Sequence, residues 1–468
     1  MKMRLNYVSA LGLAWLSLQY LSAAAAVRVG VAAVEITPPM GIPMAGYYHE
    51  RGADGVLDPL FSKAMIIESN SERVALVVLD LISVTRAVTD LAREEITKAS
   101  GIKPDHVMIS ATHAHTGPEL ADRKRASENG AQKQLVIDYT RALPGRIAES
   151  VRLANERLGP GRLSTAIGRC EGLAFNRRYY MRDGTVGWNP GRLNPNIVMP
   201  AGPTDPEVAI LYVEKPDATA PSQSIATYVN FAMHPDTTGG SQISADWPGA
   251  LSRVLGAYHG TNHFTLVANG TCGNLNHLDV SWKWPNGGPG EQNRIGTILG
   301  AAVFQAYKGL KPVELGPLRA RSERVELASP ETTPEQVSEA QRTLESTRDD
   351  RGGNFMKLVR AHRVLDIAGR KGEPQRVEVQ VIALGKELAW VGLPGEVFVE
   401  LGLAIKKRSP YHQTFVVELA NENLGYIPDR RSFAEGNYEP ESARCAPGSG
   451  EKLVEAAVKL LSDLVAGS

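Results

Sequence analysis

The sequence predicts an α/β fold with a mixed β-sheet core flanked by helices. Three observations carry this prediction. The short apolar runs 74–79 and 106–110 are typical of strands that are buried on both faces. A helical spacing of apolar residues over 85–99 connects these two runs, and strand-helix-strand units are building blocks of α/β proteins. Polar turns that contain glycine or histidine follow several of the apolar runs directly.

The first 26 residues are predicted to be a signal peptide rather than part of the fold. Lys2 and Arg4 precede a mostly apolar stretch over 8–21, and the small residues at 22–26 suit cleavage near Ala26. The alternative is an uncleaved anchor, but the apolar stretch is shorter than the roughly 20 residues that a spanning helix needs. No later stretch is longer, so we expect no stable membrane span and a secreted or periplasmic location.

The remaining elements are predicted from periodicity and turn residues. Thr333 before Pro334 marks a helix start, and the turn 69–71 joins two strands into a hairpin candidate. The stretch 178–207 is rich in Gly, Pro and Asn, but it also carries Trp188, so we interpret it as a long loop near the functional site. No internal repeat is apparent. The predicted strands are 64–67, 74–79, 106–110, 226–231, 264–268, 377–383, 388–392 and 415–419, and the predicted helices are 85–99, 248–258, 295–307, 334–349, 355–365 and 452–465.

The composition excludes several classes of protein. The 468 residues are 43% hydrophobic and 22% charged, which is enough apolar material for a large core and excludes a disordered chain. The 51 basic residues are balanced by 51 acidic ones, so no positive surplus is available for a nucleic-acid partner. Cys170, Cys272 and Cys445 are too widely spaced for a disulfide framework or a zinc ribbon, and they leave room for one disulfide at most.

Two histidines follow the predicted strand 106–110 in the segment Thr112 to Pro118. His113 and His115 are two residues apart, so in an extended chain they share a face, whereas a turn aims them differently. The spacing is compatible with two metal ligands or with one ligand beside a proton-transfer group. We favour one ligand and one acid/base residue.

Other predicted strands also end in polar groups. His234 follows the strand 226–231, and Glu396 comes shortly after the strand 388–392. The turn 269–277 contains glycines and asparagines whose backbone amides can approach a ligand closely. Each of these groups taken singly is more often structural than functional. Together with the first two histidines they predict an active site on loops at the ends of strands.

The ordered set of these motifs resembles the neutral/alkaline non-lysosomal ceramidase superfamily. The resemblance extends from about Arg28 to the end of the chain, and it rests on the order and spacing of the motifs. It implies a neutral-ceramidase-like catalytic domain over 27–468, behind the signal peptide over 1–26. The resemblance is carried by Val29 to Pro39, Asp58-Pro59-Leu60, Thr112 to Pro118, Asn176-Arg177, His234-Pro235, Asn269 to Asn276, Pro394-Gly395-Glu396, Tyr426 and Tyr438.

The resemblance also implies roles for individual residues. A single catalytic Zn²⁺ is expected on His113, His234, Glu396 and Tyr426, with Asp236 or Asp246 next in line if the tyrosine is not a ligand. Two imidazoles and a carboxylate with an open position are a usual hydrolytic zinc set. The remaining expected catalytic residues are His115 as acid/base, Arg177 and Tyr438 beside the scissile amide, and Asn274 as a residue that orients substrate or a turn.

Two departures from the family pattern accompany the resemblance. Ceramidases have a Gly-Asp-Val-Ser-Pro-Asn turn, and aligning its last residue on Asn276 places Asn274 at the serine and Cys272 at the aspartate. Cys272 has no positioned base in the sequence, so it is not a convincing nucleophile. Ceramidases also carry a further immunoglobulin-like domain, whereas this chain ends soon after Tyr438 and is expected to hold the catalytic domain alone.

Two hypotheses about function therefore stay open. The first is a secreted zinc-dependent hydrolase in which activated water cleaves an amide, such as the N-acyl amide of ceramide or of another small-molecule or lipid substrate, with an ester or peptide-like bond as a variant. The second is a noncatalytic binding or structural protein that retains the scaffold. The stretch around Trp188 shows no apolar segment for docking on a bilayer, which argues against ceramide itself. The sequence does not indicate an oligomeric state.

Overall fold

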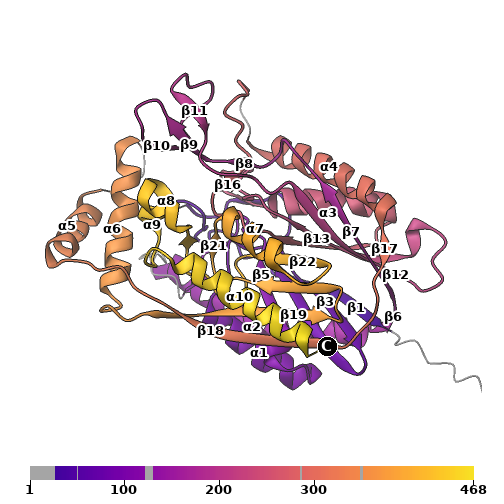
Figure 1. Ribbon diagram of the computed structural model, residues 1–468. Coiled ribbons are helices and arrows are strands. Elements are labelled where there is room, and N and C mark those ends of the chain that lie inside the picture. Colours follow the sequence, from indigo (N-terminus) through magenta and orange to yellow (C-terminus); the bar gives the residue numbers. More distant parts are fainter. Residues whose placement is uncertain (1–26, 50, 122–129, 285–286, 348–351, 468) are drawn as a thin grey trace, which may run out of the picture.

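The computed structural model describes residues 27–49, 51–121, 130–284, 287–347 and 352–467, and it confirms the α/β fold (Figure 1). Within these residues the core contains three large mixed sheets rather than one. Helices cover the outside of the sheets, as expected. The predicted signal peptide, residues 1–26, lies outside the described residues. No helix among the described residues is long and apolar enough to cross a membrane.

Each large sheet belongs to a unit with the same order of elements: three strands, a helix, a fourth strand and a second helix. The first unit is β1 (Arg28–Glu35), β3 (Phe61–Ser69), β4 (Glu72–Leu79), α1 (Arg86–Ser100), β5 (Val107–Ala111) and α2 (Gly130–Glu156). The second is β7 (Arg162–Arg169), β12 (Glu207–Glu214), β13 (Ser224–Phe231), α3 (Asp246–His259), β15 (Phe264–Asn269) and α4 (Pro289–Ala306). The third is β18 (Leu318–Leu327), β19 (Gln375–Leu384), β20 (Leu388–Gly392), α7 (Val399–Arg408), β22 (Gln413–Val417) and α10 (Ser449–Ala466).

Strand pairing is also the same in the three units. The first three strands form an antiparallel meander, and the fourth returns through a helix to lie parallel beside the third. The first, third and fourth strands of a unit therefore end at the same edge of its sheet. The repeat is one of topology, which explains why no repeat was apparent in the sequence.

The three sheets pack their inner faces against one another. Successive side chains of a strand point to opposite faces, so Leu76 of β4 enters the common core with Tyr228 and Trp390 from the other two sheets. The neighbouring Val77 points the other way, into a separate core under α1 and α2. Because both faces are buried, these strands appear in the sequence as uninterrupted apolar runs.

The chain between the first and second strands of each unit is long and lies at the edge where the parallel strands end. In the second unit it forms a small sheet, and in the third it forms a helical hairpin, which stands to one side in Figure 1. These insertions and the loops of the same edge contain β2 (Gly55–Val56), β8 (Phe175–Asn176), β9 (Arg178–Met181), β10 (Val186–Trp188), β11 (Ile197–Pro200), β14 (Gln242–Ile243), β16 (Leu275–Asn276), α5 (Pro334–Ser346), α6 (Phe355–Ala368), β21 (Glu396–Val397), β23 (Tyr426–Ile427), α8 (Arg430–Glu435) and α9 (Tyr438–Ser442). Two short strands, β6 (Gly159–Pro160) and β17 (Lys311–Pro312), extend sheet edges, and 3-10 turns lie at Pro104–His106, Pro221–Gln223, Tyr307–Gly309 and Gly352–Asn354.

All the predicted strands and helices are present, with shifted boundaries. The hairpin of β3 and β4 is confirmed, and α1 and α5 begin after the threonine caps Thr85 and Thr333. Helix α4 begins at Pro289, earlier than the predicted residue 295, because its first turn carries polar side chains that blur the periodicity. The predicted end of α5 at Asp349 falls beyond Ser346, and residues 348–351 are outside the described residues.

Several elements were not predicted. Helix α2 contains Pro144, which normally signals a helix end, yet Leu143 and Ile147 keep its apolar face buried. The stretch 178–207 was interpreted as a loop, and that prediction was wrong: β9 pairs with both β10 and β11, and tertiary pairing overrides its turn-rich composition. This stretch exposes Val198 and Met199, so it does carry apolar surface.

Candidate metal centre

The three units meet where their parallel strands end, and each contributes to one buried cluster. His113 follows β5 of the first unit, His234 follows β13 of the second, and Glu396 follows β20 of the third. The two histidines are almost fully buried. Asn269, at the end of β15 in the second unit, links the three units. Its side chain donates to the Thr112 carbonyl at 3.1 Å, and its backbone carbonyl accepts from the Glu418 amide at 3.2 Å.

Backbone carbonyls orient the two buried imidazoles. His113 Nδ1 lies 2.8 Å from the Ile82 carbonyl, and His234 Nδ1 lies 2.9 Å from the Cys272 carbonyl. A carbonyl can only accept, so Nδ1 carries a proton, and in the neutral imidazole Nε2 presents its lone pair to the cluster. His113 adopts φ 75°, a conformation that residues other than glycine rarely use, and this turn aims the ring inwards.

The ligand atoms of the cluster are close together. Glu396 Oε2 lies 3.4 Å from His113 Nε2 and 3.6 Å from His234 Nε2. His115 Nε2 is 3.2 Å from His113 Nε2, and ligand atoms of the three histidines lie within 4.8 Å of one another. His234 Nε2 is buried with no hydrogen-bond partner among the described residues. Converging lone pairs and an unsatisfied buried nitrogen are what a metal ion would resolve.

The two late tyrosines complete one wall of the cluster. Tyr426 pairs directly with Glu396 in the parallel β21–β23 ladder. The Tyr426 hydroxyl donates to the Tyr438 hydroxyl at 3.5 Å. Arg177 lies beside both rings, with its Cζ atom 5.4 Å from the centre of the Tyr426 ring and 5.8 Å from that of Tyr438. The structure therefore brings these predicted site residues together with the histidine cluster.

Charges within the cluster compensate for burial. Burial disfavours the charged form of His113, but contact with Glu396 outweighs it and raises the pKa of His113 above its usual range. Burial and the neighbouring His113 hold the pKa of His115 well below normal. The pKa of Glu396 is well below its usual range, because contacts with the two buried imidazoles outweigh the opposing effect of burial. The carboxylate is therefore ionised at neutral pH.

The family model for the N-terminal part of neutral/alkaline non-lysosomal ceramidases matches residues 27–255, which include both buried histidines and Arg177. The chain belongs to the neutral/alkaline ceramidase superfamily.

Solved ceramidase structures share the fold of this superfamily member. The crystal structure of neutral ceramidase from Pseudomonas aeruginosa has a TM-score of 0.72 at 20% identity, covering 94% of this chain and 75% of that one. A structure of ceramidase complexed with C2 has a TM-score of 0.69 at 20% identity, covering 94% of this chain and 76% of that one.

In this superfamily member the other expected residues have different surroundings. Asp246 accepts hydrogen bonds from Thr237 and Thr238, so its oxygens are engaged outside the cluster. Asp236 Oδ1 accepts from the Tyr47 hydroxyl at 2.6 Å and lies 3.8 Å from His115 Nδ1. Asp236 thus borders the acid/base candidate rather than the ligand atoms of the cluster.

Asn274, which aligns with the ceramidase serine, is fully engaged in holding its own turn. Its side chain accepts from the Val399 amide at 2.9 Å and donates to Glu400 Oε2 at 2.9 Å. Both contacts are to the start of α7, and its carbonyl accepts from the Arg177 amide. These contacts agree with the turn-orienting half of our interpretation, because both polar atoms of the Asn274 side chain hold the start of α7.

Sequence reasoning missed Glu418, the fully buried residue that directly follows β22. Its carboxyl accepts from the Cys272 and Val397 amides at 3.0 and 2.9 Å and from the Cys272 thiol at 2.9 Å. Burial raises the pKa of Glu418 to about 8. Burial and Glu418 also raise the pKa of Cys272 well above normal, which makes a thiolate nucleophile there unfavourable. A charged residue directly after an apolar run was the available signal.

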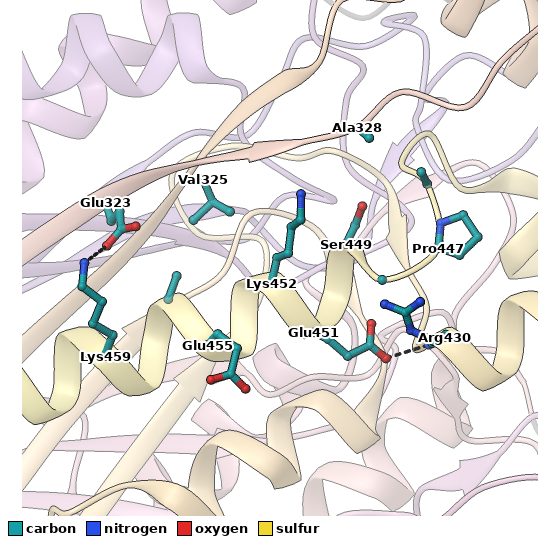
Figure 2. Close-up of a pocket in the computed structure, with 13 residues that line it drawn as sticks. Glu323, Val325, Ala328, Arg430, Pro447, Ser449, Glu451, Lys452, Glu455 and Lys459 are labelled. Atoms are coloured by element: carbon teal, nitrogen blue, oxygen red, sulfur yellow. Dashed lines mark hydrogen bonds and ion pairs between the residues drawn. The ribbon is translucent and has the colours of Figure 1, made fainter.

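A cavity of about 360 Å³ opens onto the cluster, lined by His113, His115, Glu396, Tyr426 and Tyr438 among others. A separate hollow of about 480 Å³ lies between β18 and α10 (Figure 2). Two of its carboxylates are engaged: Glu323 forms an ion pair with Lys459 at 2.9 Å, and Glu451 accepts from the Arg430 backbone amide at 2.8 Å. Cys170, Cys272 and Cys445 are buried and free, so the disulfide that the sequence left room for is absent.

Proposed function

We propose that this protein is a secreted, zinc-dependent hydrolase that cleaves an N-acyl amide by water attack. The observation that carries the proposal is the buried convergence of His113 Nε2, His234 Nε2 and Glu396 Oε2 in a cavity open to small molecules. Membership of the ceramidase superfamily supports a hydrolase, and amide cleavage follows from that likeness. Secretion rests on the signal-peptide pattern of residues 1–26.

The donor set suits Zn²⁺. We propose His113, His234, Glu396 and Tyr426 as the ligands, since imidazoles and a carboxylate are typical zinc ligands and Tyr426 is the direct neighbour of Glu396. When bound, zinc would polarise the substrate carbonyl and acidify the attacking water. The Ile82 and Cys272 carbonyls fix the two imidazoles in the orientation that such an ion needs.

We assign proton transfer to His115. Its Nε2 reaches the cluster and its pKa is held low by burial, so the imidazole is neutral and can accept a proton from water at neutral pH. Asp236, 3.8 Å from His115 Nδ1, can stabilise the imidazolium that forms. The same proton can then be delivered to the leaving amine.

Arg177 and Tyr438 would stabilise negative charge on the amide oxygen. Arg177 is held by Glu439 at 2.7 Å and by the Gly273 carbonyl at 2.7 Å, so its position is fixed before substrate binds. The Tyr438 hydroxyl lines the cavity beside Tyr426. The alternative, a noncatalytic binding protein, is favoured by Asn274 at the serine position, but water attack requires no serine.

Metal content measured together with turnover tests the proposal. We expect about one zinc per chain by elemental analysis, and hydrolysis of at least one member of a panel of N-acyl amides. His113→Ala and His234→Ala should lose the metal, because removing one of four ligands weakens binding and distorts the site. His412→Ala, at an exposed histidine, is the matched control and should keep both. Active protein without bound metal would refute the assignment, and metal without turnover would favour the binding protein.

A further inference from the structure

Two arginines lie on the wall of the same cavity that opens onto the metal cluster. Arg370 comes just after α6, and Arg444 comes just after α9. Both line the 360 Å³ cavity together with His113, His115 and Glu396. The cavity therefore offers a substrate both the metal cluster and the two arginines.

Arg444 is close to the proposed ligands. A Cβ atom added at Gly425 would lie only 2.7 Å from Arg444 Nη1, so the guanidinium packs directly against that glycine. The Gly425 carbonyl accepts from the Glu396 amide at 2.9 Å, and Gly425 immediately precedes Tyr426. Arg444 thus packs against the residue that precedes Tyr426 and that accepts the hydrogen bond of the Glu396 amide.

The protein satisfies only part of the hydrogen-bonding capacity of the two arginines. Arg444 Nε bonds Asp366 Oδ2 at 2.6 Å, and Arg370 Nη2 donates to the Arg444 carbonyl at 3.3 Å. A guanidinium has five N–H donors. Arg370 Nε is buried without an acceptor among the described residues, which is costly for a charged group.

The charges around the pair are also unequal. Asp366 forms an ion pair with Arg444. The trio of Arg370, Arg444 and Asp366 contains two guanidinium groups and one carboxylate, so it has one positive charge in excess. Burial and the nearby Arg444 lower the pKa of Arg370, and the opposing effect of Asp366, which the two arginines share, does not offset them. The other charged groups on the cavity wall are Glu119, which has its own partner, His362 and the cluster residue Glu396.

Tyr48 and Tyr438, which also line the cavity, belong to an aromatic cluster with Trp188 and Phe355. The rings of Trp188 and Phe355 stack with centres 5.2 Å apart, and Tyr438 packs against both at 4.4 and 5.2 Å. Tyr48 closes the group edge-on to Phe355 at 5.3 Å. The rings of Tyr48 and Tyr438 suit the apolar acyl part of a substrate, whereas the arginine wall suits an anion.

We propose that Arg370 and Arg444 form a subsite for a carboxylate, so that the substrate is an N-acyl amide whose amine part is an amino acid. The inference rests on the proposed hydrolase function and specifies its substrate class. A carboxylate fits because planar guanidinium groups bind it through paired hydrogen bonds and because the trio has one charge in excess. A phosphate dianion would overcompensate that charge.

Equilibrium binding of compounds that the protein cannot cleave tests the subsite independently of catalysis. The probes are non-hydrolysable ethers of equal chain length: (decyloxy)acetate, 2-(decyloxy)ethanol and 2-(decyloxy)ethyl phosphate, titrated into the metal-loaded protein by calorimetry. We expect the carboxylate to bind at least about tenfold more tightly than the alcohol, since hydrogen bonds to charged groups contribute a binding free energy of that size. We also expect it to bind more tightly than the phosphate.

Substitutions of the two arginines test whether they cause the preference for the carboxylate. Arg370→Gln should reduce the carboxylate-to-alcohol ratio about tenfold, and the double variant with Arg444→Gln should abolish it. Arg408→Gln, in an exposed pair with Glu455, is the control and should keep it. Unchanged binding of the alcohol shows that a variant is folded. If Arg370→Gln fails that check, Arg370→Lys replaces it. Lysine keeps the charge but lacks the planar guanidinium, so we expect a partial loss of the carboxylate-to-alcohol ratio.

Three outcomes would overturn the subsite: equal binding of acid and alcohol, a preference for phosphate, or a preference that survives both arginine substitutions and so belongs to the metal. Turnover is measured separately with N-decanoylglycine and N-decanoylethanolamine. Absence of turnover on both, with the binding preference intact, would refute the hydrolase and leave the subsite standing.

Discussion

Glu396 and Tyr426 lie opposite each other in the parallel β21–β23 ladder, which brings a carboxylate and a phenol together from strands 30 positions apart in the sequence. Burial raises the pKa of Tyr426 well above its usual range, although Arg177 opposes this. Arg177 alone does not ionise the phenol, so a metal ion would be needed in addition. Removing the Tyr426 hydroxyl while keeping its ring therefore tests whether this tyrosine is a metal ligand or only a structural residue.

Tyr426→Phe should fold normally but lose metal affinity or turnover, because phenylalanine keeps the buried ring and removes the oxygen. Metal titration and unfolding by urea measure the two effects independently. Tyr411→Phe, at a buried tyrosine whose hydroxyl has no hydrogen-bond partner among the described residues, is the control. Wild-type zinc content and rate in Tyr426→Phe would mean that this tyrosine is not the fourth ligand.

His115→Ala should retain zinc but lower turnover by roughly 10²–10⁴-fold, the usual effect of removing a general acid or base. Elemental analysis and steady-state kinetics measure the two properties. The three histidines form one compact group, so loss of zinc in this variant would instead make His115 a ligand. Unchanged activity would remove its catalytic role.

Asn274→Ala should weaken turnover without abolishing it, because its side chain holds the start of α7 through Val399 and Glu400. Loss of these buried hydrogen bonds should destabilise the protein by about 1–3 kcal/mol. Mass spectrometry of enzyme quenched during turnover should show no acylated residue, since water is the expected nucleophile. An acyl adduct on Cys272 or on any serine or threonine would contradict the mechanism.

Glu418→Ala should destabilise the fold by about 2–5 kcal/mol, since it leaves a cavity and two buried amides, of Cys272 and Val397, without an acceptor. Urea unfolding measures the loss. Glu418→Gln, which keeps a carbonyl oxygen, should be milder, and Glu455→Ala at an exposed ion pair should have little effect. Equal stability of Glu418→Ala and wild type would show that this carboxyl does not anchor the two loops.

Acid should destabilise the protein partly through His263. Burial, with a smaller effect of His259, lowers the pKa of folded His263 to about 3, so between about pH 6.5 and 3 the unfolded chain binds the extra proton. Stability is therefore complete above about pH 6.5 and is lost as the pH falls, by up to about 1.4 kcal/mol per pH unit. His263→Gln should flatten this dependence in urea unfolding at pH 4–7, and the exposed control His412→Gln should not. Equal slopes in wild type and His263→Gln would contradict this origin.

The sequence was sufficient to predict the α/β class and the chemistry at several strand ends. The run 74–79 and the helix after Thr85 are local patterns, and local patterns report backbone conformation and burial. His113, His234 and Glu396 were predicted because each follows a recognisable strand. Their role as metal ligands came from the family resemblance rather than from spacing.

Only the tertiary structure decided how these strand ends meet. The three units share a topology without an apparent sequence repeat, because many apolar sequences satisfy the same burial pattern. The contacts of Glu418 with Cys272, and of Arg444 with the chain beside Tyr426, join residues far apart in the chain. Periodicity carries no information about such contacts. The sequence by itself determined the α/β class, many of the strands and the groups that end them, and packing of three sheets around one core decided that those groups converge.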